Sequence, residues 1–210
     1  MRIVCLSDTH LIHRKGAIEV PDGDLLVHAG DATYRGKPKE IRQFNDWFAG
    51  LPHRHKIFVA GNHDFGFERE PDAARALLDS SITYLMDAEV VIEGLRIWGS
   101  PWQPWFHDWA FNLPRGPDIR AKWQLIPAGI DVLITHGPPL GIGDRTVFGD
   151  DVGCADLLDE IRSRIKPRLH VFGHIHEGYG RYQQDGVTYV NACTVDEQYQ
   201  LRNPPVVVDL

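Results

Sequence analysis

Short apolar runs alternate along this chain with amphipathic segments, a pattern that predicts strands alternating with helices. Strands are expected at residues 3–6, 25–27, 57–60, 132–134, 171–172, 180–184, 187–191 and 205–208. Helices are expected at residues 38–50, 71–78, 117–126 and 153–165. Apolar residues at 89–92 and 95–99 flank Glu93-Gly94 and predict a hairpin. We therefore expect an α/β fold with two packed sheets, forming one domain over residues 1–210.

A polar motif follows each of the first five predicted strands. The motifs are Asp8-Thr9-His10, Gly30-Asp31, Gly61-Asn62-His63-Asp64, Thr135-His136-Gly137 and Gly173-His174-Ile175-His176. Ligands of open α/β sheets bind beyond the carboxyl ends of the strands, so we expect these segments to converge. One such motif alone has an ordinary explanation, such as a turn, but five in this order predict a shared metal site. Histidine and carboxylate ligands suit zinc, manganese and iron.

The alternation of His174 and His176 indicates two metals. If this segment is extended, the two rings point to opposite sides and can serve two neighbouring ions. Asp31, which has two carboxylate oxygens, is the candidate bridge between them. Two ions about 3.5–4 Å apart can hold a phosphoryl group and lower the pKa of a bound water.

Composition narrows the class of partner. The chain has 210 residues, 43% of them hydrophobic, and a net charge of −7. A duplex-DNA binder needs a basic cluster, and the sequence shows none, so a small substrate is favoured and no stable nucleic-acid complex is expected. No signal peptide and no apolar run of about 20 residues is evident, so we expect a cytoplasmic protein without a membrane partner. The sequence leaves the oligomeric state open.

The three cysteines and six of the histidines lie outside the five motifs. The three scattered cysteines, Cys5, Cys154 and Cys193, are expected to be buried small side chains rather than disulfide partners. The remaining histidines are expected on the surface or in packing: His13, His28, His53, His55, His107 and His170.

The segment at residues 100–112 is rich in aromatic side chains and has two interpretations. It contains Trp102, Trp105, Phe106, Trp109 and Phe111. One interpretation is a wall over the site on which a nucleotide base stacks. The other, which we favour because aromatic side chains act most often through buried area, is a long loop pinned to the body of the protein.

The five motifs resemble those of the calcineurin-like metallophosphoesterase superfamily, and within it the small metallophosphoesterase-domain phosphodiesterases. The resemblance extends to Gly143-Asp144-Arg145-Thr146, to Gly153-Cys154 and to the run from His170 to Glu177. It implies a four-layer α-β-β-α sandwich, the metallophosphoesterase fold, with two packed mixed sheets flanked by helices. It also implies phosphoester hydrolysis at a dinuclear metal centre.

The resemblance implies a role for each site residue. Asp8, His10 and His176 would hold the first metal, Asn62, His136 and His174 the second, and Asp31 would bridge them. Asn62 and His63 would contact the substrate, and His63 would be the catalytic acid that protonates the leaving oxygen. Manganese, iron and zinc are the candidate ions, with manganese expected to support activity best.

The chain departs from the family pattern at one position. At another position it retains a histidine that some relatives lack. Many members have Gly-Asp-x-x-Asp-Arg-Gly, in which the second Asp orients the catalytic histidine, whereas Tyr34 stands there in this chain. What orients His63 is therefore open. Some animal relatives lack one histidine of the Gly-His-x-His motif, but this chain has both His174 and His176.

The expected activity is hydrolysis of small phosphodiesters, cyclic nucleotides among them, by attack of a metal-bridging hydroxide. Three alternatives share the fold: a phosphomonoesterase or nucleotidase, a nuclease, and a non-catalytic protein-binding scaffold. A scaffold usually shows replaced ligands, and here all seven ligands and His63 are present.

Overall fold

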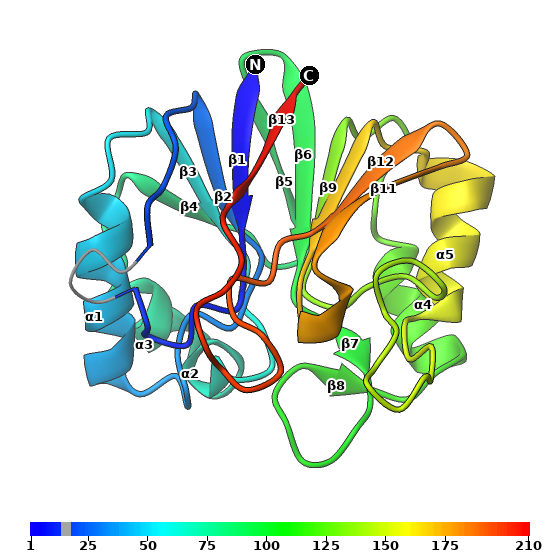
Figure 1. The fold of residues 1–210 in the computed structure, drawn as a ribbon, viewed down its shortest axis with the longest axis horizontal. Coiled ribbons are helices and arrows are strands. Elements are labelled where there is room, and N and C mark those ends of the chain that lie inside the picture. The colour runs from blue at the N-terminus through cyan, green and yellow to red at the C-terminus, as the bar shows by residue number, and fades with distance from the viewer. Residues whose placement is uncertain (14–17) are drawn as a thin grey trace.

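Two mixed sheets pack face to face at the centre of the protein, and helices cover both outer sides (Figure 1). The computed structural model describes residues 1–13 and 18–210. The arrangement is the expected four-layer α-β-β-α sandwich, so the predicted fold class is confirmed.

The first sheet has the order β13-β1-β2-β3-β4. Its strands are β1 (Arg2–Leu6), β2 (Leu25–His28), β3 (His55–Phe58), β4 (Ile82–Tyr84) and β13 (Val206–Asp209). The strands β1 to β4 are parallel, and β13 pairs with β1 in the antiparallel direction. This last pairing brings the two chain ends together, and the N-terminal amine donates to the carbonyl of Leu210 at 2.8 Å.

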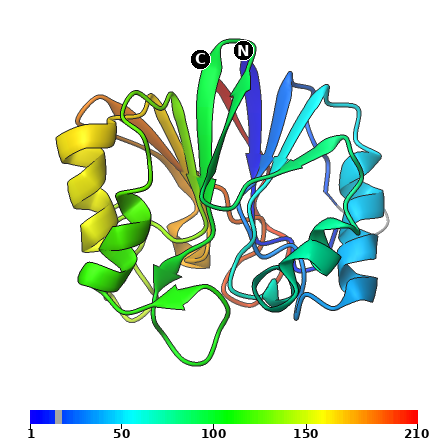
Figure 2. The ribbon, with the colours of Figure 1, turned by 180° about the vertical axis from the view of Figure 1, so that it is seen from behind.

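The second sheet has the order β11-β12-β10-β9-β6-β5. Its strands are β5 (Ala88–Ile92), β6 (Leu95–Ser100), β9 (Val132–Thr135), β10 (Leu169–Phe172), β11 (Gly180–Gln184) and β12 (Val187–Asn191). The predicted hairpin is the antiparallel pair β5 and β6. A short ladder of β7 (Gln103–Pro104) and β8 (Asn112–Leu113) carries a loop that projects at the lower edge in Figure 2.

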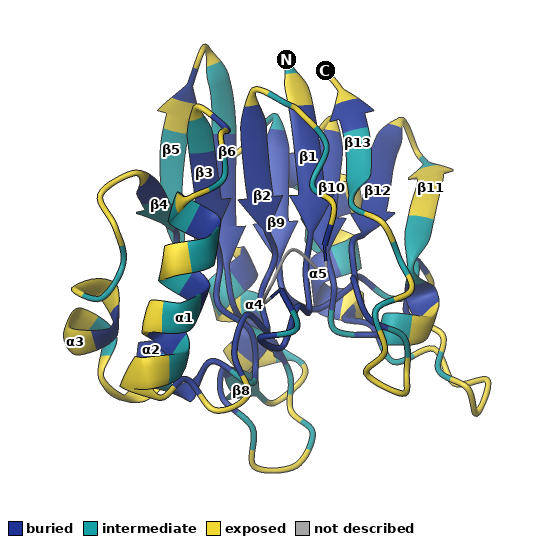
Figure 3. Ribbon diagram, turned by 60° about the vertical axis from the view of Figure 1, so that its left-hand side comes forward, coloured by how far each residue is buried: buried dark blue, intermediate teal, exposed yellow. Residues whose placement is uncertain are grey.

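Alternation along the strands explains the layers, because successive side chains point to opposite faces of a sheet. In β1, Ile3 and Cys5 belong to the core between the two sheets, whereas Val4 and Leu6 pack toward the outer helices. The central strands, such as β1, β2, β9 and β10, are almost wholly buried, whereas the edge strands β5, β11 and β13 are partly exposed, and the outer helices expose one face (Figure 3).

The helices are α1 (Pro38–Ala49), α2 (Phe65–Arg69), α3 (Pro71–Arg75), α4 (Pro117–Trp123) and α5 (Ala155–Glu160). The first three cover the outer face of the first sheet, and α4 and α5 cover that of the second (Figure 1). Within the described residues, no helix combines the length and apolar character needed to cross a membrane.

Several predicted boundaries were wrong. The helices expected at 71–78 and 117–126 end earlier, at Arg75 and Trp123, and the strand expected at 57–60 spans His55–Phe58. The helix expected at 153–165 starts at Ala155 and becomes a π-helical turn at Ile161–Ile165. Lys166 ends that turn in the left-handed region with a φ of 47°, and Pro167 after it cannot continue the helix.

Candidate metal centre

The carboxyl ends of five parallel strands from both sheets meet at one edge of the sandwich. These strands are β1, β2, β3, β9 and β10, and the five polar motifs follow them. The structure therefore brings the predicted site segments together, as the strand-end argument requires.

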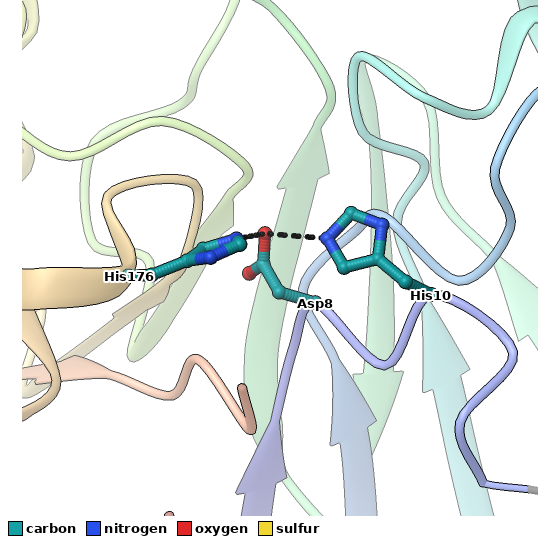
Figure 4. Close-up of side chains that lie close together, drawn as sticks. All are labelled: Asp8, His10 and His176. Atoms are coloured by element: carbon teal, nitrogen blue, oxygen red, sulfur yellow. Dashed lines mark ion pairs between the residues drawn. The ribbon is translucent and has the colours of Figure 1, made fainter. Parts of the chain in front are cut away.

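Asp8, His10 and His176 form the first group of possible metal ligands (Figure 4). Asp8 Oδ1 lies 3.3 Å from His176 Nε2 and 3.9 Å from His10 Nε2. Asp8 Oδ2 accepts the backbone N–H of His174 at 3.0 Å and the thiol of Cys193 at 3.1 Å. Oδ1 is thus left without a hydrogen-bond donor in the described residues, and so are both ring nitrogens of His10. Buried polar atoms without partners are costly, and a cation between them removes that cost.

Asp31 stands between this group and a second one. Its Oδ2 lies 3.9 Å from His10 Nε2, while its Oδ1 lies 3.4 Å from His136 Nε2. The two carboxylate oxygens therefore face different ligand sets. Burial alone would raise the pKa of Asp31, but the neighbouring rings of His136 and His63 hold it below its ordinary value.

The second group centres on His136. Its Nδ1 donates to the carbonyl of Ala29 at 2.9 Å, so in the neutral ring Nε2 is a lone pair. That nitrogen lies 2.8 Å from Asn62 Oδ1, and Asp31 Oδ1 also faces it. Burial would lower the pKa of His136, but the charge of Asp31 outweighs it and raises that pKa to about 9. Three acceptor atoms at this range need a proton or a metal ion among them.

His174 is the most loosely placed of the seven expected ligands. Its ring centroid lies 5.0 Å from that of His136, but His174 belongs to none of the tight groups of His and carboxylate ligand atoms in the described residues. Those groups instead unite His63, the expected catalytic residue, with His10 and Asp31. Burial lowers the pKa of His174 to about 3, so its ring is neutral at pH 7, as a metal ligand must be.

The segment Gly173-His174-Ile175-His176 is not extended, contrary to the geometry expected for it. His174 has a φ of 71°, and His176 begins a 3₁₀ turn (His176–Gly178). The cause is Asp8, whose carboxylate holds the backbone N–H of His174. A Cβ at Gly173 would collide with this same carboxylate, which explains the glycine. The two rings still separate, since His176 meets Asp8 and His174 meets His136.

Backbone strain concentrates at the expected ligands. Asp8, His10 and Asp31 have φ values of 54°, 40° and 56°, in the left-handed region that non-glycine residues rarely adopt. Such conformations persist where the surroundings impose them, and they cluster at functional sites.

Asp64 fixes the loop after β3 to the loop after β2. Its buried carboxylate accepts the backbone N–H of Gly61 at 2.9 Å and of Thr33 at 3.0 Å, and the hydroxyl of Thr33 at 2.7 Å. Burial and the charge of Asp31 raise its pKa to about 6. Asp64 therefore aligns the segments that carry Asp31 and Asn62 without belonging to a ligand group.

The backbone of Tyr34 supplies a partner for His63. His63 Nδ1 donates to the carbonyl of Tyr34 at 3.1 Å, which leaves Nε2 facing Asp31 Oδ2 at 3.9 Å. A main-chain acceptor thus occupies the place where many family members are expected to have a carboxylate. Trp109 packs against the His63 ring, with a centroid distance of 4.3 Å.

Two histidines outside the motifs form hydrogen bonds to segments that carry expected ligands. His28 Nε2 lies 2.9 Å from the hydroxyl of Thr9, and His170 Nε2 lies 2.8 Å from that of Thr135. Each threonine immediately precedes an expected ligand. None of the six histidines outside the motifs belongs to a possible metal group in the described chain. Their predicted roles in packing or at the surface agree with these positions.

A cleft of about 230 Å³ opens over the two groups. It is lined by Asp31, Asn62, His63, Phe106, Trp109, His174, His176, Glu177, Glu197 and Tyr199. Tyr199 comes from the loop after β12, and its ring lies 4.9 Å from that of His10. Sequence reasoning missed Tyr199 and the Asp8 partner Cys193, because no motif marks the C-terminal loop.

The aromatic segment divides between the two interpretations. Phe106 and Trp109 line the cleft. Trp102 and Phe111 instead pin the loop: Phe111 is fully buried, and the Trp102 indole donates to Asp87 at 2.9 Å. Trp105 is 60% exposed and does not line the cleft. Of the three tryptophans in this segment, Trp109 is the one that lines the cleft.

Comparison with known proteins agrees with this geometry. Residues 1–178 match the model of the calcineurin-like phosphoesterases. The chain belongs to this family. Its members are hydrolytic phosphoesterases that typically hold a dinuclear metal centre, and the clustered Asp and His side chains of this phosphoesterase fit such a centre.

Three named proteins are similar in sequence to this calcineurin-like phosphoesterase. It is 48% identical to human metallophosphoesterase domain-containing protein 1 over its whole length and 71% of that protein. It is 39% identical to UPF0046 protein T07D4.2 of Caenorhabditis elegans, over its whole length and 60% of that protein. A Synechococcus protein named probable cyclic nucleotide phosphodiesterase is 28% identical over 85% of this chain and 67% of its own.

Proposed function

We propose that this phosphoesterase hydrolyses small phosphodiesters, cyclic nucleotides among them, at a two-metal centre. The observation that carries the proposal is the position of Asp31, whose two oxygens face His10 on one side and His136 on the other. A carboxylate placed between two sets of nitrogen and oxygen ligands is suited to bridging two cations.

The donor set fits divalent transition metals. Asp8, His10 and His176 would hold one ion, Asn62, His136 and His174 the other, and Asp31 would join them. The fit rests on the unpartnered Asp8 Oδ1 and His10 nitrogens and on the crowded acceptors around His136. The ions would draw negative charge from the phosphoryl group and lower the pKa of the attacking water. Nitrogen-rich ligation favours manganese, iron or zinc over calcium or magnesium.

His63 is suited to give a proton to the leaving oxygen. Tyr34 holds its Nδ1 and Trp109 supports its ring, so Nε2 is directed toward the centre of the site. As the P–O bond to the leaving alcohol breaks, the protonated His63 ring would transfer its Nε2 proton to that oxygen. Asn62 and His63 both line the cleft and can contact the phosphate.

The cleft favours a diester over a monoester. Its lining contains no Lys or Arg in the described chain, and Glu177 and Glu197 lie at its wall. Cationic side chains stabilise a bound monoester dianion more than a bound diester, which carries a single charge. A site without such side chains therefore disfavours the monoester more than the diester. Phe106, Trp109 and Tyr199 supply ring surface for an organic substituent. Arg145, a candidate cation for a monoester, is paired with Asp151 at 2.9 Å.

The test is a ratio of kcat/KM values on protein reconstituted with manganese. Bis-nitrophenyl phosphate and mono-nitrophenyl phosphate have the same leaving group and differ in the class of ester. We expect the diester to be favoured and adenosine cyclic phosphates to be cleaved. A tenfold or larger preference for the monoester would replace the proposal with a phosphomonoesterase.

A further inference from the structure

A basic groove is formed by residues of α1, α2 and α3 together with the segment that precedes α1. It has a volume of about 410 Å³, and its cationic members are Arg35, Lys37, Arg42 and Arg69. Glu70 is the acidic side chain in its lining. Phe65, Ile41 and Leu77 give it an apolar floor. Four cations against one carboxylate contrast with the net charge of −7 of the whole chain.

These cations lack anionic partners. No ion pair within the described residues involves Arg35, Lys37, Arg42 or Arg69. Glu40 is close, but its carboxylate accepts the backbone N–H groups of Arg35 and Lys37, at 2.8 and 3.3 Å. The guanidinium groups of Arg35 and Arg69 both lie over the ring of Phe65, at 5.7 and 4.5 Å. Like charges held together without a counter-ion are a favourable place for an anion.

Arg35 connects the groove to the catalytic cleft. Its guanidinium lies 4.8 Å from the centroid of Trp109, and Trp109 packs on His63. The groove therefore begins on the side of the site where His63 would meet the leaving oxygen. A leaving alcohol that extends from His63 past Trp109 would reach Arg35 first and Arg69 beyond it.

We propose that the basic groove is a subsite for a second phosphate group, carried by the leaving alcohol of the diester. This inference rests on the proposed phosphodiesterase function. The phosphate would pair with Arg35, Arg42 and Arg69, and the carbon skeleton of the alcohol would lie on the apolar floor. The natural substrate would then be a phosphodiester with a further phosphate, such as a short oligonucleotide with a phosphorylated end.

Binding to metal-free protein tests the subsite without catalysis. Thymidine 3′-phosphate, thymidine and inorganic phosphate would be titrated calorimetrically into chelator-treated protein. We expect thymidine 3′-phosphate to bind most tightly, and Arg69→Gln or Arg42→Gln to weaken it about tenfold, the effect of losing one charged hydrogen bond. Arg181→Gln, an exposed charge on β11, is the matched control and should bind as the wild type does. Equal binding of inorganic phosphate would overturn the inference, because the alcohol would then contribute nothing.

Cleavage of two dinucleotides, on manganese-loaded protein, then tests the direction of the leaving group. Thymidylyl-thymidine with a 3′-terminal phosphate should have a kcat/KM about tenfold above that of the same dinucleotide without it. Arg69→Gln should bring the ratio close to one, and Arg181→Gln should preserve it. Equal cleavage of both dinucleotides would refute the subsite and leave the phosphodiesterase proposal standing. Cleavage of neither, with bis-nitrophenyl phosphate also intact, would refute the phosphodiesterase proposal itself.

Discussion

His63 donates its Nδ1 proton to the backbone carbonyl of Tyr34, at 3.1 Å. Because a carbonyl lacks a formal charge, it orients the ring without the strong attraction that a carboxylate would exert on an imidazolium. A main-chain acceptor is also independent of the side chain at that position. The Tyr34 carbonyl can therefore orient the His63 ring without the carboxylate that many family members are expected to have.

Replacing His63 should remove general acid catalysis and spare the metal ions. His63→Ala should lower kcat by about 10²–10⁴-fold for a poor leaving group, since a positioned acid contributes that much. The loss should shrink for a nitrophenol, which departs without a proton. Tyr34→Phe is the control and should retain activity, because only its backbone contacts His63 Nδ1. Equal losses for good and poor leaving groups would show that His63 binds phosphate and donates no proton.

Asp31→Asn should disturb both ions at once. The amide has one oxygen to offer, so it cannot bridge two cations as a carboxylate does. Metal content, measured by elemental analysis, and turnover should fall together, and further than in His10→Asn, which removes a ligand of one ion alone. Two metals per chain with normal turnover in Asp31→Asn would rule out the bridge.

Metal binding should release protons near neutral pH. Since the pKa of His136 in the metal-free protein is raised to about 9, its ring is protonated at pH 7 and must lose that proton to bind a cation. Calorimetry in buffers of different ionisation enthalpy should detect the release of about one proton from the His136 ring when the metal binds. Metal binding at pH 7 without proton release would contradict this assignment.

The raised pKa of His136 also determines the direction in which the stability of the metal-free protein changes with pH. A folded pKa above the ordinary value of 6.5 stabilises the metal-free protein below pH 6.5, and that contribution is lost as the pH rises through 9. The melting temperature of the metal-free protein should therefore fall across this range. The metal-loaded protein should not show this fall, because the ion replaces the proton.

The sequence predicted the layers and the convergence of the site because both follow from strand pattern and strand direction. Apolar runs such as residues 3–6 mark buried strands, and parallel strands deliver their following residues to one edge. Short elements escaped prediction: α2 (Phe65–Arg69) and β4 (Ile82–Tyr84) are too brief to show a period. The partners Cys193 and Tyr199 also escaped, since their approach to Asp8 and His10 depends on the path of a C-terminal loop.

The basic groove was not predicted from the sequence, for a related reason. Arg35 and Arg42 lie near each other in the sequence, but Arg69 joins them only through the packing of α2 beside the loop after β2. A search for a contiguous run of basic residues cannot detect such a cluster. The absence of a linear cluster in the sequence therefore did not exclude a local anion site.

The rings of Phe106 and Tyr199 should matter for substrates that carry a base. Phe106 and Tyr199 are partly exposed and line the cleft, so their replacement should leave the fold intact. Because base stacking is worth about 1–3 kcal/mol, Phe106→Ala or Tyr199→Ala should raise KM for a cyclic nucleotide on the order of tenfold. The KM for methyl nitrophenyl phosphate, which has no base, should change much less. Trp105→Ala, in the same loop but outside the cleft, is the matched control and should leave both KM values unchanged. If Phe106→Ala and Tyr199→Ala raise KM equally for both substrates, these rings shape the cleft and do not recognise a base.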